Sequence, residues 1–310
     1  MQAILLDGHF LIEHLARNRS GRFFNFNGTA GIWRRACIEE AGGWQHETLT
    51  EDLDLSYRAQ LQGWRFVFLP DVVTPAELPA GMRAFKSQQH RWAKGSVETA
   101  RKLLGRILKA RHLPLATRME AFFHLTENFA YLFMIVLAVL LWPSIVVRRQ
   151  MHASPLSFID LPVFVLASLS VAFFYVQSQR RAGRGWWASL LSIPAVMGLG
   201  SALALNNGGA VLEALVGRKS AFIRTPKDGL SDGQKRRRRP ASYRSSPSVL
   251  PLLESVFALY MGLALLDVAR RGGWSWIPFL IIFFWGFAST AALGWREVVL
   301  WGPSSARGTG

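Results

Sequence analysis

The sequence is poor in cysteine and in acidic residues. Its 310 residues contain one cysteine, Cys37, so no internal disulfide can form, which fits a reducing compartment. Asp and Glu together number 20, against 36 Lys and Arg. A secretory signal peptide is not expected, because Asp7, His9 and Glu13 interrupt any apolar core near the N-terminus.

Apolar side chains and positive charge are abundant instead. Half of the residues are hydrophobic, and the formal net charge is +16. Such a basic balance fits either nucleic-acid binding or the cytoplasmic side of a membrane protein. The long uncharged stretches favour a membrane protein, and no pattern of a nucleic-acid-binding module accompanies the charge. The sequence therefore predicts a lipid bilayer as a partner, and no nucleic acid.

Composition changes near Leu115. The residues before it are mixed in polarity and broken by turn signals, as in a soluble α/β segment. The residues after it contain uncharged runs of about 20 residues, long enough to cross a bilayer, and one further run whose only interior acid is Glu254. These runs are 128–147, 161–179, 185–212, 245–266 and 272–295.

The number of crossings follows from charge. Residues 213–244 are dense in Arg and Lys, so this loop is expected on the cytoplasmic side. If the basic segment before Leu115 is also cytoplasmic, an even number of crossings must separate the two. Three apolar runs lie between them, so one should lie in the interface or re-enter. We expect this of 185–212, because Pro194, Gly198 and Gly200 make it a poor lipid-facing helix.

Residues 97–110, VETARKLLGRILKA, have an amphipathic pattern. Val97, Leu103 and Ile107 fall opposite Arg101 and Lys102 on a helix. A basic amphipathic helix suits the membrane surface. Packing against a protein partner is the alternative.

Residues 49–64, LTEDLDLSYRAQLQGW, are predicted to form a helix. Thr48 and Glu51 have capping-box spacing, and Gly63 provides a stop. Asp52 and Asp54 would then lie in the first turn, where the helix dipole favours an ionised carboxylate. That setting suits a catalytic base, and it is equally a common structural arrangement.

A second pattern occurs in residues 87–95, SQQHRWAKG. Gln88, Arg91 and Trp92 at i, i+3 and i+4 share one helical face. An indole can stack on a sugar ring, a guanidinium can bind a diphosphate at two points, and an amide can hydrogen-bond hydroxyls. The alternative is a helix lying on the membrane interface, where Trp and Arg are common.

The third pattern is FFNFNGTAGIWRR, residues 23–35. Gly28 permits close approach of a ligand to the backbone, while Phe26, Asn27 and Thr29 offer a stacking face and hydrogen bonds. An ordinary turn leading into a helix is the alternative.

The order FNGTA, TED and QxxRW, followed by an amphipathic helix and membrane runs, resembles the processive family 2 glycosyltransferases, which include cellulose, chitin, hyaluronan and β-mannan synthases. AFIRTPK, residues 221–227, resembles the gating loop of that family (FxVTxK), with Arg224 where the pattern has Val. The residues around the motifs are most similar to those of the cellulose-synthase-like A and bacterial glucomannan-synthase-like branch.

The resemblance implies a role for each motif. Asp52, with Thr50 and Glu51 completing the catalytic TED motif, would be the general base that deprotonates the acceptor hydroxyl, and Asp54 would be structural. Gln88, Arg91 and Trp92 would hold the acceptor end and the donor diphosphate. The other implied residues are Phe26, Asn27, Gly28 and Thr29 beside the acceptor, and Phe222, Thr225 and Lys227 over the nucleotide.

The resemblance also implies partners and a cofactor. The family uses a divalent metal, Mg²⁺ or Mn²⁺, bound through a DxD motif in an N-terminal half, and Asp7 is the only aspartate here before Glu51. No metal site is therefore expected in this chain, which looks like the C-terminal portion of a synthase. A second chain that supplies the other half is one explanation. The expected ligands are a nucleotide sugar and a growing polysaccharide.

The predicted fold is a partial α/β, GT-A-type catalytic segment followed by an α-helical transmembrane domain of about four spanning helices plus interfacial helices. A plasma (inner) membrane location with a cytoplasmic catalytic segment is expected. Two functions stay open: a processive inverting hexosyltransferase using GDP-mannose or UDP-glucose, and a non-catalytic membrane fragment or accessory subunit. The predicted divisions are 1–96 catalytic, 97–118 interfacial helix, 119–180 two spans, 185–212 interfacial or re-entrant, 213–244 basic loop, 245–296 two spans and 297–310 tail.

Overall fold

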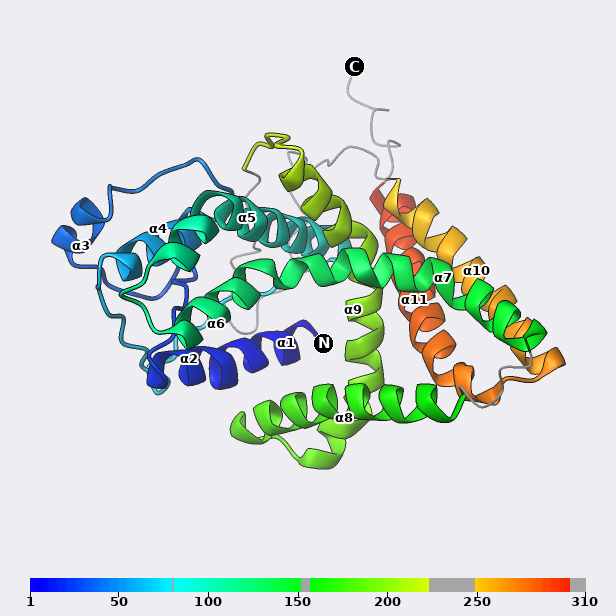
Figure 1. Ribbon diagram of the computed structural model, residues 1–310. Helices are drawn as coiled ribbons and strands as arrows, with labels where there is room; N and C mark the ends of the chain where they lie inside the picture. The colour runs from blue at the N-terminus through cyan, green and yellow to red at the C-terminus, as the bar shows by residue number, and fades with distance from the viewer. Residues whose placement is uncertain (80, 152–156, 223–248, 302–310) are drawn as a thin grey trace, which may run out of the picture.

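The computed structural model describes residues 1–79, 81–151, 157–222 and 249–301, and these residues form helices joined by turns and irregular segments (Figure 1). The helices are α1 Gln2–Gly8, the π-helix η1 His9–His14, α2 Leu15–Arg19, α3 Arg35–Glu40, α4 Glu51–Leu61, α5 Met82–Lys109, α6 Leu115–Thr126, the 3₁₀ helix η2 Glu127–Phe129, α7 Ala130–Gln150, α8 Ser157–Arg181, α9 Trp186–Leu215, α10 Leu250–Arg271, the 3₁₀ helix η5 Trp274–Trp276 and α11 Ile277–Trp301.

The five predicted apolar runs correspond to α7, α8, α9, α10 and α11. Each of these helices, α7 together with α6, is long and apolar enough to cross a membrane. Figure 1 shows α2, α3 and α4 at one side of the molecule and α10 and α11 at the other, with α9 between them. The chain thus has one part of short helices and another of membrane-length helices.

Helix α9 is central to the packing of the long helices. It contacts α5, α7, α8 and α11, and half of its most apolar window is buried, the largest share among the five helices. Gly198 of α9 meets Gly286 of α11 backbone to backbone, and a Cβ atom on Gly208 would lie 2.6 Å from Ile135 Cδ1. Small residues at such crossings let helices approach closely. Gly198, one of the residues that make α9 a poor lipid-facing helix, therefore serves a helix contact, whereas no atom lies within 4 Å of the Cβ position of Gly200. The position of α9 relative to a bilayer stays a prediction.

The α/β prediction for residues 1–96 is not confirmed, since no strand occurs in the described part of the chain. Residues 64–70 show why. Their exposure alternates along the segment, with Phe66 and Phe68 facing the protein and Val67 and Leu69 exposed. Phe66 and Phe68 both make edge-on contacts with Phe24. The segment has the period of a strand, but no second strand pairs with it in the described residues.

Helix α5 is continuous through the QxxRW motif and the amphipathic stretch, and it ends before residues 110–114 turn into α6. The predicted division 97–118 therefore contains the end of one helix and the start of another. Val97, Leu103 and Ile107 are fully buried, in clusters with side chains of α4, α6 and α9. This apolar face thus packs against other helices of the same chain, and neither the membrane surface nor a protein partner is needed to cover these three side chains.

The N-terminal end of α5 is fixed by α10 and α11. The carboxylate of Glu297 accepts hydrogen bonds from Met82 N, at 2.6 Å, and Arg83 N, at 3.0 Å. Lys86 Nζ lies 2.5 Å from Glu254 Oε1, and both side chains are buried. Free N–H groups at a helix start favour a carboxylate partner. The membrane-length helices therefore hold the helix that carries QxxRW.

Candidate active site

Helix α4 presents a polar stripe, Asp52, Ser56 and Gln60, to residues 24–28. Gln60 binds both the N–H and the C=O of Phe24, at 3.2 and 2.8 Å. Ser56 Oγ accepts from Phe26 N at 2.8 Å and donates to Asp52 O at 2.6 Å. Four helical residues advance about 6 Å and two extended residues about 6.6 Å, so positions i, i+4 and i+8 of the helix match alternate residues of the segment. The stripe fixes the register of the FNG motif on the TED helix.

Gly28 lies at the end of this register, beside Asp52. Its φ angle is +70°, and a Cβ atom at this position would lie 3.0 Å from Asp52 Oδ2. Glycine is required on both counts, because other residues rarely adopt that φ and a side chain would crowd the carboxylate. The FNG and TED motifs, separated by more than 20 residues, thus meet at one carboxylate oxygen.

Asp52 combines burial with few compensating contacts. Burial raises its pKa to about 6; the Leu53 N–H and the Arg91 guanidinium oppose the rise, and the Glu51 charge adds to it. The Leu53 N–H donates to Oδ1 at 2.9 Å. A carboxylate with a pKa near 6 is ionised at neutral pH and more basic than a solvated one. Asp52 is therefore chemically suited to accept a proton.

Asp54 has a different environment. It is 1% exposed, and its carboxylate lies 2.8 Å from Arg58 Nε and 3.1 Å from Lys102 Nζ. Arg58 also donates to the carbonyl oxygens of Ala41 and Gly43. Asp54 thus ties α4 to α5 and to the turn after α3, which is the structural position expected for it.

The predicted capping box is wrong. Helix α4 begins at Glu51 with Thr50 as the preceding residue, and neither Thr50 nor Thr48 uses its hydroxyl as a cap. The reason is the close approach of α5, since a Cβ atom on Gly95 would lie 2.5 Å from Thr50 Oγ1. Leu49 N finds its acceptor on α5 as well, at 2.8 Å from Glu98 Oε2. Tertiary contacts replace the local cap.

Arg91 links the QxxRW motif to Asp52. Its charge acts on Asp52, and its guanidinium lies 4.7 Å from the ring centre of Phe222, the first residue of the gating-loop pattern within the described chain. Lys94, one turn along α5, binds Glu213 at 2.9 Å and also contacts Ser220 Oγ. The guanidinium stacking is a cation–π contact. Helix α5 therefore holds the segment after α9 beside Arg91 and Lys94.

The remaining predicted site residues are dispersed around this cluster. Gln88 Oε1 accepts from Gln2 Nε2 at 3.0 Å, and Trp92 is 39% exposed. Phe26 packs against Gly31 and makes an edge-on contact with Trp33, while Thr29 is exposed. Thr225 and Lys227 lie outside the described residues.

The described residues do not fit a divalent metal. No group of three His, Cys, Asp or Glu side chains among them is placed to hold one. The sequence Asp52-Leu53-Asp54 has the DxD pattern of a metal site, but Asp54 forms ion pairs with Arg58 and Lys102. The positive charges beside it repel a cation, so Asp52 and Asp54 do not form a metal pair.

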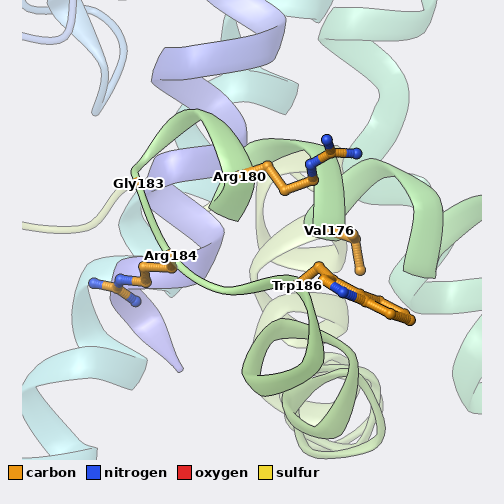
Figure 2. A pocket seen from close by; sticks show the side chains of 5 residues that line it. All are labelled: Val176, Arg180, Gly183, Arg184 and Trp186. Atoms are coloured by element: carbon orange, nitrogen blue, oxygen red, sulfur yellow. The ribbon is translucent and has the colours of Figure 1, made fainter.

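Two hollows lie apart from Asp52. One of about 500 Å³ at the turn between α8 and α9 is lined by Val176, Arg180, Gly183, Arg184 and Trp186. Figure 2 shows Arg180 and Arg184 extending in opposite directions from this turn, so the two guanidinium groups do not converge. The other, of about 340 Å³, is lined by Glu47, Thr48, Glu98, Arg101, Lys102, Gly217, Arg218 and Lys219. Neither hollow includes a predicted site residue.

Several residues of the site were not predicted from the sequence. Ser56 and Gln60 continue from Asp52 at intervals of four, and that polar stripe in a buried helix is a readable signal. Gly95 and Lys94 stand directly after QxxRW, but nothing local distinguishes them. His9 and His14 give no signal either, because their approach to Asn27 depends on a π-helix.

Asp52 is a partly buried carboxylate with a raised pKa, beside a glycine turn and within the electrostatic influence of Arg91. Such an arrangement is of the kind that can serve base-assisted group transfer. Comparison with known proteins narrows this class. The family model described as Glycosyl transferase family group 2 matches residues 6–198. The chain belongs to this glycosyltransferase family, which confirms the resemblance found from the motifs.

The similar proteins are named as mannosyltransferases. The chain is 49% identical to glucomannan 4-beta-mannosyltransferase 2 of Arabidopsis thaliana over 109 residues, 35% of this chain and 20% of the relative. It is 42% identical to glucomannan 4-beta-mannosyltransferase 1 of Oryza sativa subsp. japonica over 124 residues, 40% and 24% of the two chains. It is 35% identical to probable glucomannan 4-beta-mannosyltransferase 10 of Arabidopsis thaliana over 175 residues, 56% and 32%. The chain spans a fifth to a third of the length of these relatives.

Proposed function

We propose that the chain is the acceptor-side part of a membrane-embedded, inverting glycosyltransferase that adds hexosyl units from a nucleotide sugar to a β-linked polysaccharide. The observation that carries the proposal is Asp52, a partly buried carboxylate with a pKa of about 6 whose oxygen faces Gly28. Such a group can take the proton of an acceptor hydroxyl while that oxygen attacks the anomeric carbon from the side opposite the leaving diphosphate.

The other motifs have supporting roles in this proposal. Arg91 and Trp92 of α5 would bind the diphosphate and stack on a sugar ring, and Phe222, Thr225 and Lys227 would cover the nucleotide. Gln88 would hold the acceptor end together with Phe26, Gly28 and Thr29. The relatives' names favour mannose from GDP-mannose over glucose from UDP-glucose. No step is assigned to a metal, since the described residues do not fit one.

Radiolabelled sugars test the proposal. Membranes that contain the chain are incubated separately with labelled GDP-mannose and UDP-glucose, and polymer is precipitated. We expect label from GDP-mannose in the wild type, and none with Asp52→Asn, while binding of the nucleotide sugar by that variant is retained. Undiminished incorporation by Asp52→Asn would refute the base assignment.

A second candidate is a non-catalytic subunit of a polysaccharide synthase, in which the membrane-length helices provide only a membrane and acceptor surface. In that case the wild type alone incorporates neither sugar. Incorporation would then require added membranes that hold a second polypeptide, and it would be insensitive to Asp52→Asn. The same assay therefore separates the two candidates.

The proposed location is a plasma (inner) membrane with the catalytic segment on the cytoplasmic side. The basic loop that supports this orientation lies mostly outside the described residues. A cysteine placed at Ser231 should react with an impermeant maleimide only when the cytoplasmic face is open. The native Cys37 is 3% exposed and gives little background. Labelling of intact cells would overturn the orientation.

A further inference from the structure

A π-helical stretch brings two histidines together at the N-terminus. Residues five apart in an α-helix point about 140° away from each other. His9 and His14 are five apart, yet their ring centres lie 4.2 Å from each other, because η1 is a π-helix with wider turns. Both rings face the side chain of Asn27 from the FNG motif.

The Asn27 amide is almost fully used by these contacts. Its Oδ1 accepts from His9 Nε2, at 3.4 Å, and from Asn25 Nδ2. Its Nδ2 donates to His14 Nε2 at 2.9 Å. A primary amide has two acceptor and two donor positions, so one N–H is left. Little of the amide remains for a ligand.

His14 is suited to remain an acceptor. It is 2% exposed and has aromatic contacts with Phe10, Phe24 and Phe68. Burial, helped by the charges of His9 and Arg17, lowers the pKa of His14 to about 3. The neutral ring keeps a lone pair on Nε2 at all pH values near neutrality.

His9 completes the clamp from the other side. Its Nδ1 lies 3.0 Å from Glu13 Oε2, and its Nε2 faces Asn27 Oδ1. Both partners are acceptors, so the ring has an acceptor within reach of either nitrogen. The Asn27 amide thus lies between the His9 ring on one side and the His14 ring on the other.

We propose that His9 and His14 are positioning residues that act through Asn27 to hold Gly28 against Asp52, and that Asn27 itself is not a sugar ligand. Asn27 stands between the Phe26 N–H, fixed by Ser56, and Gly28, whose Cβ position is 3.0 Å from Asp52 Oδ2. Gly28 and Ala30 both have positive φ, so this turn depends on outside contacts to persist. The inference rests on the proposed role of Asp52 as base.

Release of Asn27 would let the turn move and water reach Asp52. The carboxyl group would then titrate closer to an ordinary aspartate, near about 3.9. Asp52 protonation can be followed by infrared spectroscopy of the full chain in membranes, as the pH-dependent carboxyl band that Asp52→Asn removes. This measurement needs no turnover, so it stands whether or not the chain transfers sugar.

Four variants make the test specific. His14→Phe keeps an aromatic ring and loses the acceptor, and His14→Gln retains a polar side chain that can accept. Asn27→Ala removes the amide, and Phe10→Leu alters the packing around His14 without touching a hydrogen bond. We expect His14→Phe and Asn27→Ala to lower the Asp52 midpoint by one pH unit or more, and His14→Gln and Phe10→Leu to shift it by less than half as much.

Opposite results would refute the inference. An unchanged Asp52 midpoint in Asn27→Ala, combined with weaker acceptor binding, would make Asn27 a ligand. An equal shift of the Asp52 midpoint in Phe10→Leu and His14→Phe would show that His14 contributes only through packing. If His14→Phe does not fold, Asn27→Ala decides alone, because that side chain is only partly buried. Failure of the proposed function is seen separately, as polymer synthesis that survives Asp52→Asn.

Discussion

The Cβ position of Gly95 lies 2.5 Å from Thr50 Oγ1, so helix α5, just after its QxxRW motif, rests directly on the first residue of TED. No side chain fits between them. This contact sets the distance between Asp52 on α4 and Arg91 on α5, the two charges of the proposed site. The distance between the TED and QxxRW motifs in the fold therefore depends on residue 95 being glycine, without the methyl group of alanine.

Gly95→Ala should separate the two helices and reduce activity. The added methyl group meets both the side chain and the backbone N of Thr50, so the shift cannot be absorbed by a side-chain rotation alone. We expect a loss of stability of about 1–3 kcal/mol, the usual cost of overpacking. Thermal unfolding in detergent and sugar incorporation measure the two effects.

Gly105→Ala is the matched control, since it lies in the same helix with no atom within 4 Å of its Cβ position. It should stabilise the chain by up to about 1 kcal/mol through helix propensity. Equal effects of the two substitutions would show that the Thr50 contact is unimportant.

The transfer rate should rise with pH through a midpoint near 6, because the base must be ionised and burial raises the pKa of Asp52 to about 6. The pH dependence of the initial rate at saturating donor tests this. A rate that is constant from pH 5 to pH 8 would exclude Asp52 as the base.

Asp52→Asn should stabilise the fold at pH 8 while it abolishes activity. The folded-state pKa is raised from 3.8 to about 6, so the wild type loses stability as pH rises between these values, and the amide does not. Solvent exposure limits the gain to about 1–3 kcal/mol. Unfolding temperatures should differ most at pH 8 and least at pH 4. A lower unfolding temperature for the variant at pH 8 would contradict the burial argument.

Asp54→Asn should have the opposite effect. It leaves Arg58, which is 5% exposed, without its carboxylate partner, and breaking a buried pair in this way costs about 3–5 kcal/mol. Glu47→Gln removes another partner of Lys102 from an exposed position and should cost less than about 1 kcal/mol. Denaturant unfolding of the two variants compares them. A mild effect of Asp54→Asn would mean that solvent reaches Arg58.

Removal of Glu254 should uncouple α5 from α10. Glu254→Leu leaves the buried Lys86 ammonium without its partner and should destabilise the chain by about 3–5 kcal/mol. The double variant with Lys86→Met removes both charges and should recover most of this loss. Thermal unfolding of the single and double variants measures the recovery. Additive losses would show that the two charges do not interact.

The long apolar helices were predictable because about 20 uncharged residues leave few alternatives to a membrane-length helix. The three motifs could be found because each carries chemistry in a short pattern. Their meeting point could not be predicted. The polar stripe of Ser56 and Gln60 can be read from the sequence, but its partner segment cannot, and the roles of Gly95 and of the π-helix at His9 depend on residues distant in the chain. The α/β prediction is not confirmed for the complementary reason, because a strand needs a neighbour that the local pattern of residues 64–70 does not supply.

The extended segment that begins at Trp64 is expected to promote aggregation. Residues 64–69 are extended and end at a turn at Pro70 and Asp71; Arg65 is the one charged residue among 64–69, and Val67 and Leu69 are each more than half exposed. Extended, apolar and weakly charged stretches associate edge to edge when two copies meet. Purified material is therefore expected to self-associate through this stretch at high concentration, and Val67→Lys, which places a charge on its outward face, should keep it dispersed.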